Sequence, residues 1–525
     1  MSIQESLAAA RILRPTRPTR IIPGMVRMPL PATSGDGVAS GSVESVRLER
    51  WAGYAPWFIL LYFALQIAVR ISISANLEMD EAEMVDAIGW GWGYRNSHPP
   101  LFHWIMRLCH DLIGYWPAVS AVSRFGLLAA AYLLVYDAAR QAGGTRVAGS
   151  LALASLFLLP TAAWKTESKL THSILCFLAT AAVVHALVLI ATRRRGWTFA
   201  WLGLAAAIGL LAKYNFIFVL TGVAVAVSSV ASMRKAFHRR EAWLALIVPV
   251  ALTLPHGMWI RAHPALAMER AYMLKTPGSL LGAHFHANSM ADGFLTLGLC
   301  TLMAVGPAIA LWLLVAGVFP RGNGNGASLV AAPEIQRVLA ALLLAELGVF
   351  VLAIALGGFS QVHERYLLPL LPPLPVWLVL AFGKKLRAQG AAAVLSLGVL
   401  LAVFISLAWP RFVLGTDNRL IFPYAAMAPE IAAVAGQAMP VAGDRADNVA
   451  NVVLHWPGAR FFHAEEKPAL VLVVSDGVEG AAQFGVSLGK NYRPDGEPRV
   501  ITRPYPSRTG NLAQLAVQRW RRVEQ

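Results

Sequence analysis

The sequence at residues 52–72 reads AGYAPWFILLYFALQIAVRIS, and the nearby residues 79–104 read MDEAEMVDAIGWGWGYRNSHPPLFHW. The first stretch is almost entirely apolar and has the roughly 20 residues that a helix needs to cross a hydrocarbon core of about 30 Å. The second stretch begins with four closely spaced carboxylates: Asp80, Glu81, Glu83 and Asp86. This succession predicts a membrane-spanning helix that is followed at once by a polar segment at the membrane border.

The composition of the whole chain supports the same interpretation. Of 525 residues, 57% are hydrophobic and only 14% are charged, which is too apolar for a soluble globular domain. The sequence therefore predicts a polytopic α-helical membrane protein. The formal net charge is +16, but the Lys and Arg residues form short clusters between apolar runs. Such clusters are typical of membrane topology, so nucleic-acid binding is not expected.

Apolar runs of sufficient length predict about eleven transmembrane helices. Lys213, Tyr214 and Asn215 divide the fifth run from the sixth, which can also be read together as one long kinked element. The predicted spans lie near residues 52–72, 117–138, 147–164, 170–192, 197–212, 214–232, 241–259, 293–318, 337–357, 366–382 and 391–410.

Clusters of positive charge set the predicted orientation, because cytoplasmic loops are enriched in Lys and Arg. With eleven crossings and a cytoplasmic N-terminus, every cluster falls inside: Arg47 with Arg50, Arg140 with Arg146, and residues 193–195, 234–240 and 384–387. The same orientation places five segments on the outer face of the membrane: residues 79–104, 166–172, 260–292, 361–366 and everything after Pro410.

Three regions are expected along the chain. Residues 1–50 contain RPTRPTR and a Gly/Ser-rich run, which predict a disordered basic cytoplasmic arm. Residues 51–410 form the transmembrane domain. In residues 411–525 the pattern changes: VLVVS at 471–475 is typical of a strand and ADNVANVVLHW at 446–456 of a helix. This alternation predicts a small periplasmic α/β domain.

The four carboxylates after the first span have two interpretations. An interfacial helix that lies flat on the bilayer would carry such residues without any chemistry, and we prefer this interpretation for Glu83 and Asp86. Asp80 and Glu81 directly follow the span, where a carboxylate faces lipid headgroups. Because such a position is unfavourable, we expect these two residues to have a function.

Five motifs follow one another along the predicted membrane domain: the Asp80-Glu81 pair, GYRNSHPPLFHW from Gly93, TESKLTHSILCF from Thr166, LGLAAAIGLLAKYNF from Leu202 and ERYLLPLLPPLPVWL from Glu364. In order and spacing the chain resembles the membrane-embedded GT-C glycosyltransferases. It is most similar to bacterial relatives of the protein O-mannosyltransferases and of the enzymes that add aminoarabinose or galacturonic acid to lipid A. The resemblance covers most of residues 52–410.

The resemblance implies a reaction. Such enzymes take a sugar from a polyprenyl phosphate, which lies among the membrane lipids. They pass the sugar to a hydroxyl of lipid A, a polysaccharide, another lipid or a protein, usually with inversion of the anomeric centre. This displacement needs a general base near the hydroxyl and positive charge near the departing phosphate. By its match to the family's first-loop acid, Asp80 is expected to be the base. Glu81 is expected to orient Asp80 or the acceptor, with a metal-ligand role left open.

A second outer acid precedes the fourth span. Many relatives have an aspartate there, whereas this chain has Glu167. We expect Glu167 to be catalytic as well, with an ion pair to Lys165 or Lys169 as the alternative.

Cations at the outer helix ends are candidates for binding the donor phosphate. They are Arg365, Lys213 and His363, together with Lys165 and Lys169. The alternative for Arg365 and Lys213 is that each side chain only snorkels towards the headgroups.

Four further residues of these motifs are expected to position the substrates: Tyr94, His98, Tyr214 and Tyr366. For His98 the alternative is a turn, because Pro99 excludes the helical conformation from the residue before it.

The sequence predicts no metal site. The best histidine cluster is His284 with His286, near His263 in the 260–292 loop, but no carboxylate lies at a diagnostic distance from it. Because some relatives use a divalent metal ion and others use none, the resemblance leaves such a cofactor open.

The rival interpretation is a polytopic transporter or flippase for lipids or saccharides. It predicts ionisable residues deep in the spans and broken helices in paired halves. Here, apart from Arg124 and Glu346, the charges gather at one border of the spans. This asymmetry favours a glycosyltransferase that works at the periplasmic face.

Overall fold

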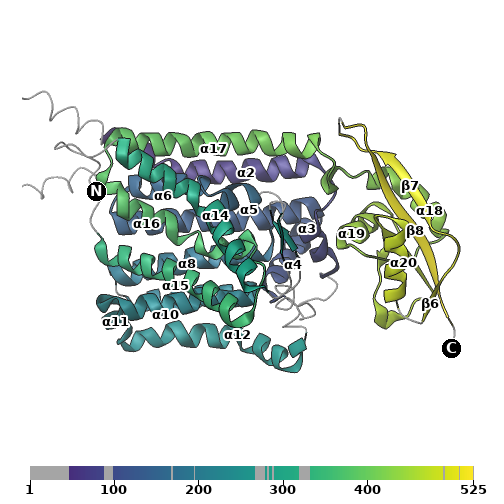
Figure 1. The fold of residues 1–525 in the computed structure, drawn as a ribbon, viewed down its shortest axis with the longest axis horizontal. Coiled ribbons are helices and arrows are strands. Elements are labelled where there is room, and N and C mark those ends of the chain that lie inside the picture. Colours follow the sequence, from purple (N-terminus) through teal and green to yellow (C-terminus); the bar gives the residue numbers. More distant parts are fainter. Residues whose placement is uncertain are drawn as a thin grey trace, which may run out of the picture.

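The structure is a computed structural model that describes residues 46–87, 98–166, 170–193, 195–265, 278–280, 283–285, 289–318, 332–488, 491–507 and 509–523. Figure 1 shows two parts: a bundle of long, roughly parallel helices and, at one end of it, a smaller domain that contains a sheet.

Each predicted apolar run contains an α-helix, although α6 (Arg146–Phe157) and α16 (Pro373–Phe382) are shorter than the runs predicted at 147–164 and 366–382. In the described part of the chain, seven helices are long and apolar enough to cross a membrane, and the bent pair Tyr214–Ser229 and Ala231–Phe237 adds an eighth if it is one span. Three shorter apolar helices account for the remaining predicted spans. These findings confirm the predicted fold class. The bundle consists of α2 (Ala55–Ile73), α5 (Trp116–Gly143), α6 (Arg146–Phe157), α8 (His172–Arg193), α9 (Gly196–Ala212), α10 (Ile217–Ser229), α12 (Leu244–Ala262), α14 (Met290–Val318), α15 (Pro333–Gly357), α16 (Pro373–Phe382) and α17 (Ala388–Gly415).

The start of the first span differs from the prediction. Its helix already begins at Val46, within the predicted arm of residues 1–50. The rest of that arm lies outside the described residues.

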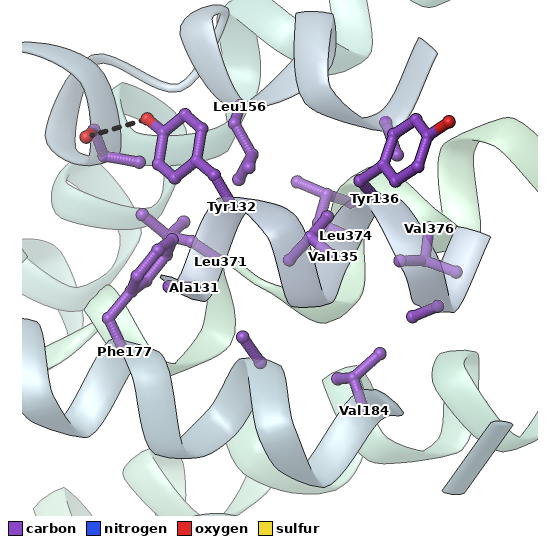
Figure 2. Close-up of a cluster of buried hydrophobic side chains, with 14 of the residues drawn as sticks. Ala131, Tyr132, Val135, Tyr136, Leu156, Phe177, Val184, Leu371, Leu374 and Val376 are labelled. Carbon is purple, nitrogen blue, oxygen red and sulfur yellow. Dashed lines mark hydrogen bonds between the residues drawn. The ribbon is translucent and has the colours of Figure 1, made fainter. Parts of the chain in front are cut away.

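The core of the bundle is built around α8. In an apolar stretch of 18 residues of this helix, 83% of the residues are buried inside the protein. Figure 2 shows part of this core, where Tyr132 of α5 lies near Phe177 of α8 and Leu156 of α6. The Tyr132 hydroxyl donates a hydrogen bond of 3.3 Å to the backbone oxygen of Ala162. Its polar end is thus satisfied inside the apolar interior.

Short turns interrupt the helices between spans. After α6, Pro160 precedes the π-helical turn Thr161–Lys165. Two 3-10 turns, η6 (Glu364–Tyr366) and η7 (Leu368–Leu370), precede the proline-rich start of α16. The turn η3 (Tyr214–Phe216) joins α9 to α10 and packs closely on α9, because a Cβ at Gly209 would lie 2.2 Å from the Phe216 ring.

Other short elements complete the bundle. The helices α3 (Met79–Ala87) and α4 (Leu101–Ile113) lie at the end that faces the small domain, and α11 (Ala231–Phe237) lies at the opposite end (Figure 1). The strands β1 (Gly278–Leu280) and β2 (Ala283–Phe285) form an antiparallel hairpin. The 3-10 turns η4 (Arg240–Trp243) and η8 (Gly383–Lys385) precede α12 and α17.

The C-terminal domain confirms the predicted mixture of strands and helices. In its sheet the strand order is β4-β3-β5-β8-β6, with β7 also paired to β8. The neighbours of β3 are parallel to it, whereas those of β8 are antiparallel to it. The elements are η9 (Arg419–Ile421), α18 (Tyr424–Ala435), β3 (Pro440–Gly443), α19 (Ala446–His455), β4 (Arg460–Phe461), η10 (Ala464–Glu466), β5 (Leu470–Ser475), α20 (Val478–Ser487), β6 (Tyr492–Pro494), β7 (Arg499–Pro504) and β8 (Leu512–Arg522).

Candidate active site

Glu81, in the first turn of α3, is buried against two arginines. Its carboxylate oxygens lie 2.7 Å from Nη2 of Arg70, near the end of α2, and 3.3 Å from Nη1 of Arg124 on α5. The Ser120 hydroxyl donates a third bond of 2.6 Å to the same carboxylate. Burial raises the pKa of Glu81, but the two guanidinium groups more than offset this effect and lower it to about 2. The charged carboxylate therefore holds α3 against the bundle.

Asp80 precedes Glu81 on α3, and its side chain points in a different direction from that of Glu81. Successive residues of an α-helix are rotated by about 100°, so Asp80 does not face the interior when Glu81 does. The Asp80 side chain is accordingly half-exposed. Farther along the helix, Asp86 Oδ1 lies 3.7 Å from Nε2 of His463 in the C-terminal domain.

Three histidines gather where α4 meets α8. The ring of His98, which precedes α4, stacks on His172 with centroids 4.3 Å apart and planes 19° apart. His103 of α4 lies 4.9 Å from the same ring. The next residue of α8, Ser173, accepts a hydrogen bond of 2.8 Å from Nζ of Lys213. The first turn of α8 therefore connects His98 with Lys213, two of the predicted site residues.

Three of the five predicted phosphate-binding side chains lie near the ring of Tyr366. Lys213 Nζ and Arg365 Cζ each lie 5.5 Å from the ring centroid, and the His363 ring lies 5.5 Å away as well. Burial, with Arg365 and Lys165 nearby, lowers the pKa of His363 below its ordinary value. The ring is therefore flanked by the basic side chains of Lys213 and Arg365 and by an imidazole with a lowered pKa.

Two predicted residues have partners that the sequence did not indicate. Lys165, at the end of the π-helical turn, forms an ion pair with Glu364, which directly precedes Arg365. Tyr214 packs towards α12, where its hydroxyl lies 3.3 Å from Nε2 of His256 and the two rings are nearly parallel, 4° apart.

The remaining predicted residues are beyond what the structure describes. Tyr94, Glu167, Lys169 and His286 lie outside the described residues. For His284 only the backbone is described, in β2, where it pairs with Ser279 of β1. Within the described ranges, no group of three or more His, Cys, Asp or Glu side chains is placed to hold a metal ion.

These groups form a continuous series of contacts. Glu81 on α3 contacts α5 through Ser120, α5 packs on α4 and α8, and α8 leads through Ser173 and Lys213 to Tyr366. The series begins at the buried Glu81, next to the half-exposed Asp80 in the sequence, and ends at a pair of cations over an aromatic ring. A carboxylate of this kind can accept a proton, and such cations can stabilise a phosphate.

Sequence reasoning did not assign His172, Ser173, Glu364, Arg70 or Ser120 to the site. His172 and Glu364 lie inside motifs already quoted for the resemblance, so their position was the available signal. Arg70, at the end of the first span, and Ser120 gave none, because their role depends on the packing of α3 against α5.

Comparison with known proteins shows which proteins the chain is similar to. Residues 97–259 match the family model described as dolichyl-phosphate-mannose-protein mannosyltransferase. The lipopolysaccharide core galacturonosyltransferase RgtB of Rhizobium johnstonii is 27% identical over 73% of this chain and 77% of its own length. RgtA, a lipopolysaccharide core galacturonosyltransferase of the same organism, is 26% identical over 76% of this chain and 80% of its own length.

A solved structure shows the same fold. ArnT from Cupriavidus metallidurans, bound to undecaprenyl phosphate, superposes with a TM-score of 0.57 at 13% identity, covering 88% of this chain and 98% of its own. Together these similarities confirm the predicted resemblance to GT-C glycosyltransferases, and they do not support the transporter alternative.

Proposed function

We propose that this membrane glycosyltransferase transfers galacturonic acid from a polyprenyl phosphate to a hydroxyl group of lipopolysaccharide, in its core or on lipid A. Three similar proteins are named for galacturonosyl transfer to lipopolysaccharide core or lipid A, and the similar ArnT structure is bound to undecaprenyl phosphate. The observation that carries the proposal is the pair of cations, Lys213 and Arg365, over the Tyr366 ring.

Donor binding combines partition into the lipid with recognition of the phosphate. Each buried methylene of the polyprenyl tail contributes about 0.8 kcal/mol of anchoring in the bilayer. The phosphate then lies at the Tyr366 ring, where Arg365 offers two parallel N–H donors and Lys213 a point charge. His363, neutral at pH 7, donates a hydrogen bond without adding charge.

The chemical step is a direct displacement at the anomeric carbon. Asp80 accepts the proton of the acceptor hydroxyl as the hydroxyl oxygen bonds to that carbon, and the bond from the carbon to the phosphate oxygen breaks. The configuration inverts because attack and departure occur on opposite faces. The polyprenyl phosphate leaves with its charge stabilised by Arg365 and Lys213.

The other predicted residues support this step. Glu81 positions Asp80 by fixing α3, and it does not contact the substrate. His98 and Tyr366, with Tyr94 and Tyr214, shape the substrate site. We propose that Glu167 acts as a second acid and that Lys165 and Lys169 contribute positive charge for the donor phosphate.

We also propose an orientation for the chain. Residues 51–410 form the catalytic domain in a bacterial inner membrane, residues 1–50 lie in the cytoplasm, and residues 411–525 lie in the periplasm. The position of α11, with its basic residues Arg234 and Lys235, at the end opposite the C-terminal domain supports this orientation (Figure 1).

A reconstituted transfer assay tests the function. The purified protein in lipid nanodiscs is incubated with undecaprenyl-phosphate-linked galacturonic acid and with lipopolysaccharide that lacks this sugar, and the products are weighed by mass spectrometry. We expect the acceptor to gain a galacturonic acid residue, and to gain less from donors that carry aminoarabinose or mannose. A monodisperse, folded sample that transfers sugar from none of these donors would contradict the proposal.

A further inference from the structure

The five residues that precede α3 are bound by the C-terminal domain. Residues 74–78 follow α2, and we call them the α3 linker. The Asn76 amide donates hydrogen bonds of 2.9 Å and 2.7 Å to the backbone oxygens of Leu420 and Phe422, and its oxygen lies 2.8 Å from Nε2 of His455. The Ser74 hydroxyl bonds to the backbone of Leu420 as well.

Asn451 of α19 makes the most specific of these contacts. Its side-chain oxygen accepts a hydrogen bond of 2.8 Å from the backbone N–H of Leu77, and its side-chain amide donates one of 2.9 Å to the backbone oxygen of the same residue. Both residues are completely buried, at 0% exposure. Two bonds to one residue fix both the position and the rotation of the linker, three residues before Asp80.

Apolar contacts extend this interface along α3. Leu77, Ala82 and Val85 form a buried cluster with Ala450 of α19. The ion pairs of Glu81 with Arg70 and Arg124 hold the same helix to the bundle. Therefore α3 contacts both parts of the protein (Figure 1).

We propose that the C-terminal domain is part of the catalytic apparatus because Asn451 positions α3, and with it the Asp80 carboxylate, for proton transfer. This inference rests on the proposed function of Asp80. Asn451 itself touches no substrate and is a positioning residue. Because a displacement of about 1 Å from attack geometry lowers a rate by about a hundredfold, a loosened linker lowers turnover without weakening donor binding.

Two variants and a matched control test this role. Asn451→Ala removes both bonds to Leu77, and His455→Ala removes only the contact with Asn76 at a half-buried position. The control, Val473→Ala, removes methyl groups from the centre of β5, where Val473 is fully buried. It destabilises the same domain without touching the α3 linker. Thermal unfolding of each variant verifies that it is folded at the assay temperature.

The readouts are kcat, the KM for undecaprenyl-phosphate-linked galacturonic acid, and amide hydrogen exchange of residues 74–82. For Asn451→Ala we expect kcat to fall at least tenfold, KM to change less than threefold, and exchange to accelerate in residues 74–82. For His455→Ala we expect the same pattern with a smaller loss of kcat. Val473→Ala retains the wild-type kcat and the wild-type exchange of this segment.

Equal losses of kcat in Asn451→Ala and Val473→Ala would overturn the inference, because they would reduce it to domain stability. Faster exchange in Asn451→Ala with an unchanged kcat would overturn it too. If Asp80→Asn retains activity while Asn451→Ala loses it, the assignment of the base fails, but the dependence of turnover on the domain contact stands. If Asp80→Asn is inactive and Asn451→Ala retains its activity, the proposed function stands and the positioning role of Asn451 is overturned.

Discussion

Arg70 and Glu81 form a 2.7 Å ion pair in which both side chains are only 1% exposed, at the junction of the first span and α3. With Arg124 on the other side of the carboxylate, one buried anion stands between two buried cations. Removing the anion leaves both guanidinium groups without this partner in a low-dielectric site.

Glu81→Gln destabilises the protein. Loss of one partner from a buried ion pair costs about 3–5 kcal/mol, because the remaining charge stays buried. We expect a clear drop in the midpoint of thermal unfolding, measured by fluorescence in detergent. Glu83→Gln, at a half-buried position of the same helix, is the control. If both variants unfold at the same temperature, the cluster does not stabilise α3.

The same cluster predicts a dependence of stability on pH. The pKa of Glu81 is lowered from 4.5 to about 2, so its stabilising contribution is complete above pH 4.5 and is lost as the pH falls towards 2. Between these values the unfolding midpoint of the wild type should fall more steeply than that of Glu81→Gln. Parallel curves for the two proteins would show that Glu81 is not the group that titrates.

Asp80→Asn abolishes most of the transferase activity while the protein remains folded. A general base contributes about 10²–10⁴-fold to a rate, and asparagine keeps the shape of the side chain without accepting a proton. We expect kcat to fall at least about a hundredfold in the reconstituted assay, with an unchanged unfolding midpoint. Transfer at the wild-type rate would exclude Asp80 as the base.

Arg365→Ala lowers turnover about tenfold or more, because one of the two positive charges near the leaving phosphate is lost. Arg365→Lys keeps the charge but not the forked donor geometry, so we expect an intermediate rate. The folded state of both variants is checked by size-exclusion chromatography and thermal unfolding. Full activity of the alanine variant in a monodisperse sample would mean that Arg365 only contacts headgroups.

Glu346→Gln leaves the protein at least as stable as the wild type. Glu346 of α15 is 1% exposed, and both its carboxylate oxygens lack a hydrogen-bond partner among the described residues. It lines a cavity of ≈ 10 Å³ with Asn215 and Tyr366. Because glutamine fits the same space without a group that can ionise, we expect an equal or higher unfolding midpoint. A large decrease would show that the carboxylate is charged and paired in the membrane.

Much of the fold followed from local properties of the sequence. A run of about 20 apolar residues is long enough to span a bilayer as a helix, and each predicted run contains an α-helix. The strand and helix predicted at 471–475 and 446–456 appear as β5 and α19 for the same reason, since their patterns are short and regular. The interruption at Lys213 was visible as well, because a lysine and an asparagine do not continue an apolar helix.

The site was predictable only in part. The motifs predicted site roles for Asp80, Lys213, Arg365 and Tyr366, and the structure brings the last three together at one ring. Partners that depend on the packing of distant helices had no local signal. Arg124 stood out as a deep charge, but its pairing with Glu81 requires the approach of α3 to α5. The contact between Asn451 and Leu77 likewise exists only after two domains meet.

The C-terminal domain is attached at more than one place, among them the chain after Gly415 of α17 and its contact with the α3 linker. A body held by a single connection can swing on a hinge, whereas one held at two separated points cannot turn about the first without pulling on the second. Any rocking of this domain is therefore also a displacement of α3. A large glycolipid that displaced the domain would therefore also move the Asp80 carboxylate away from the position proposed for proton transfer.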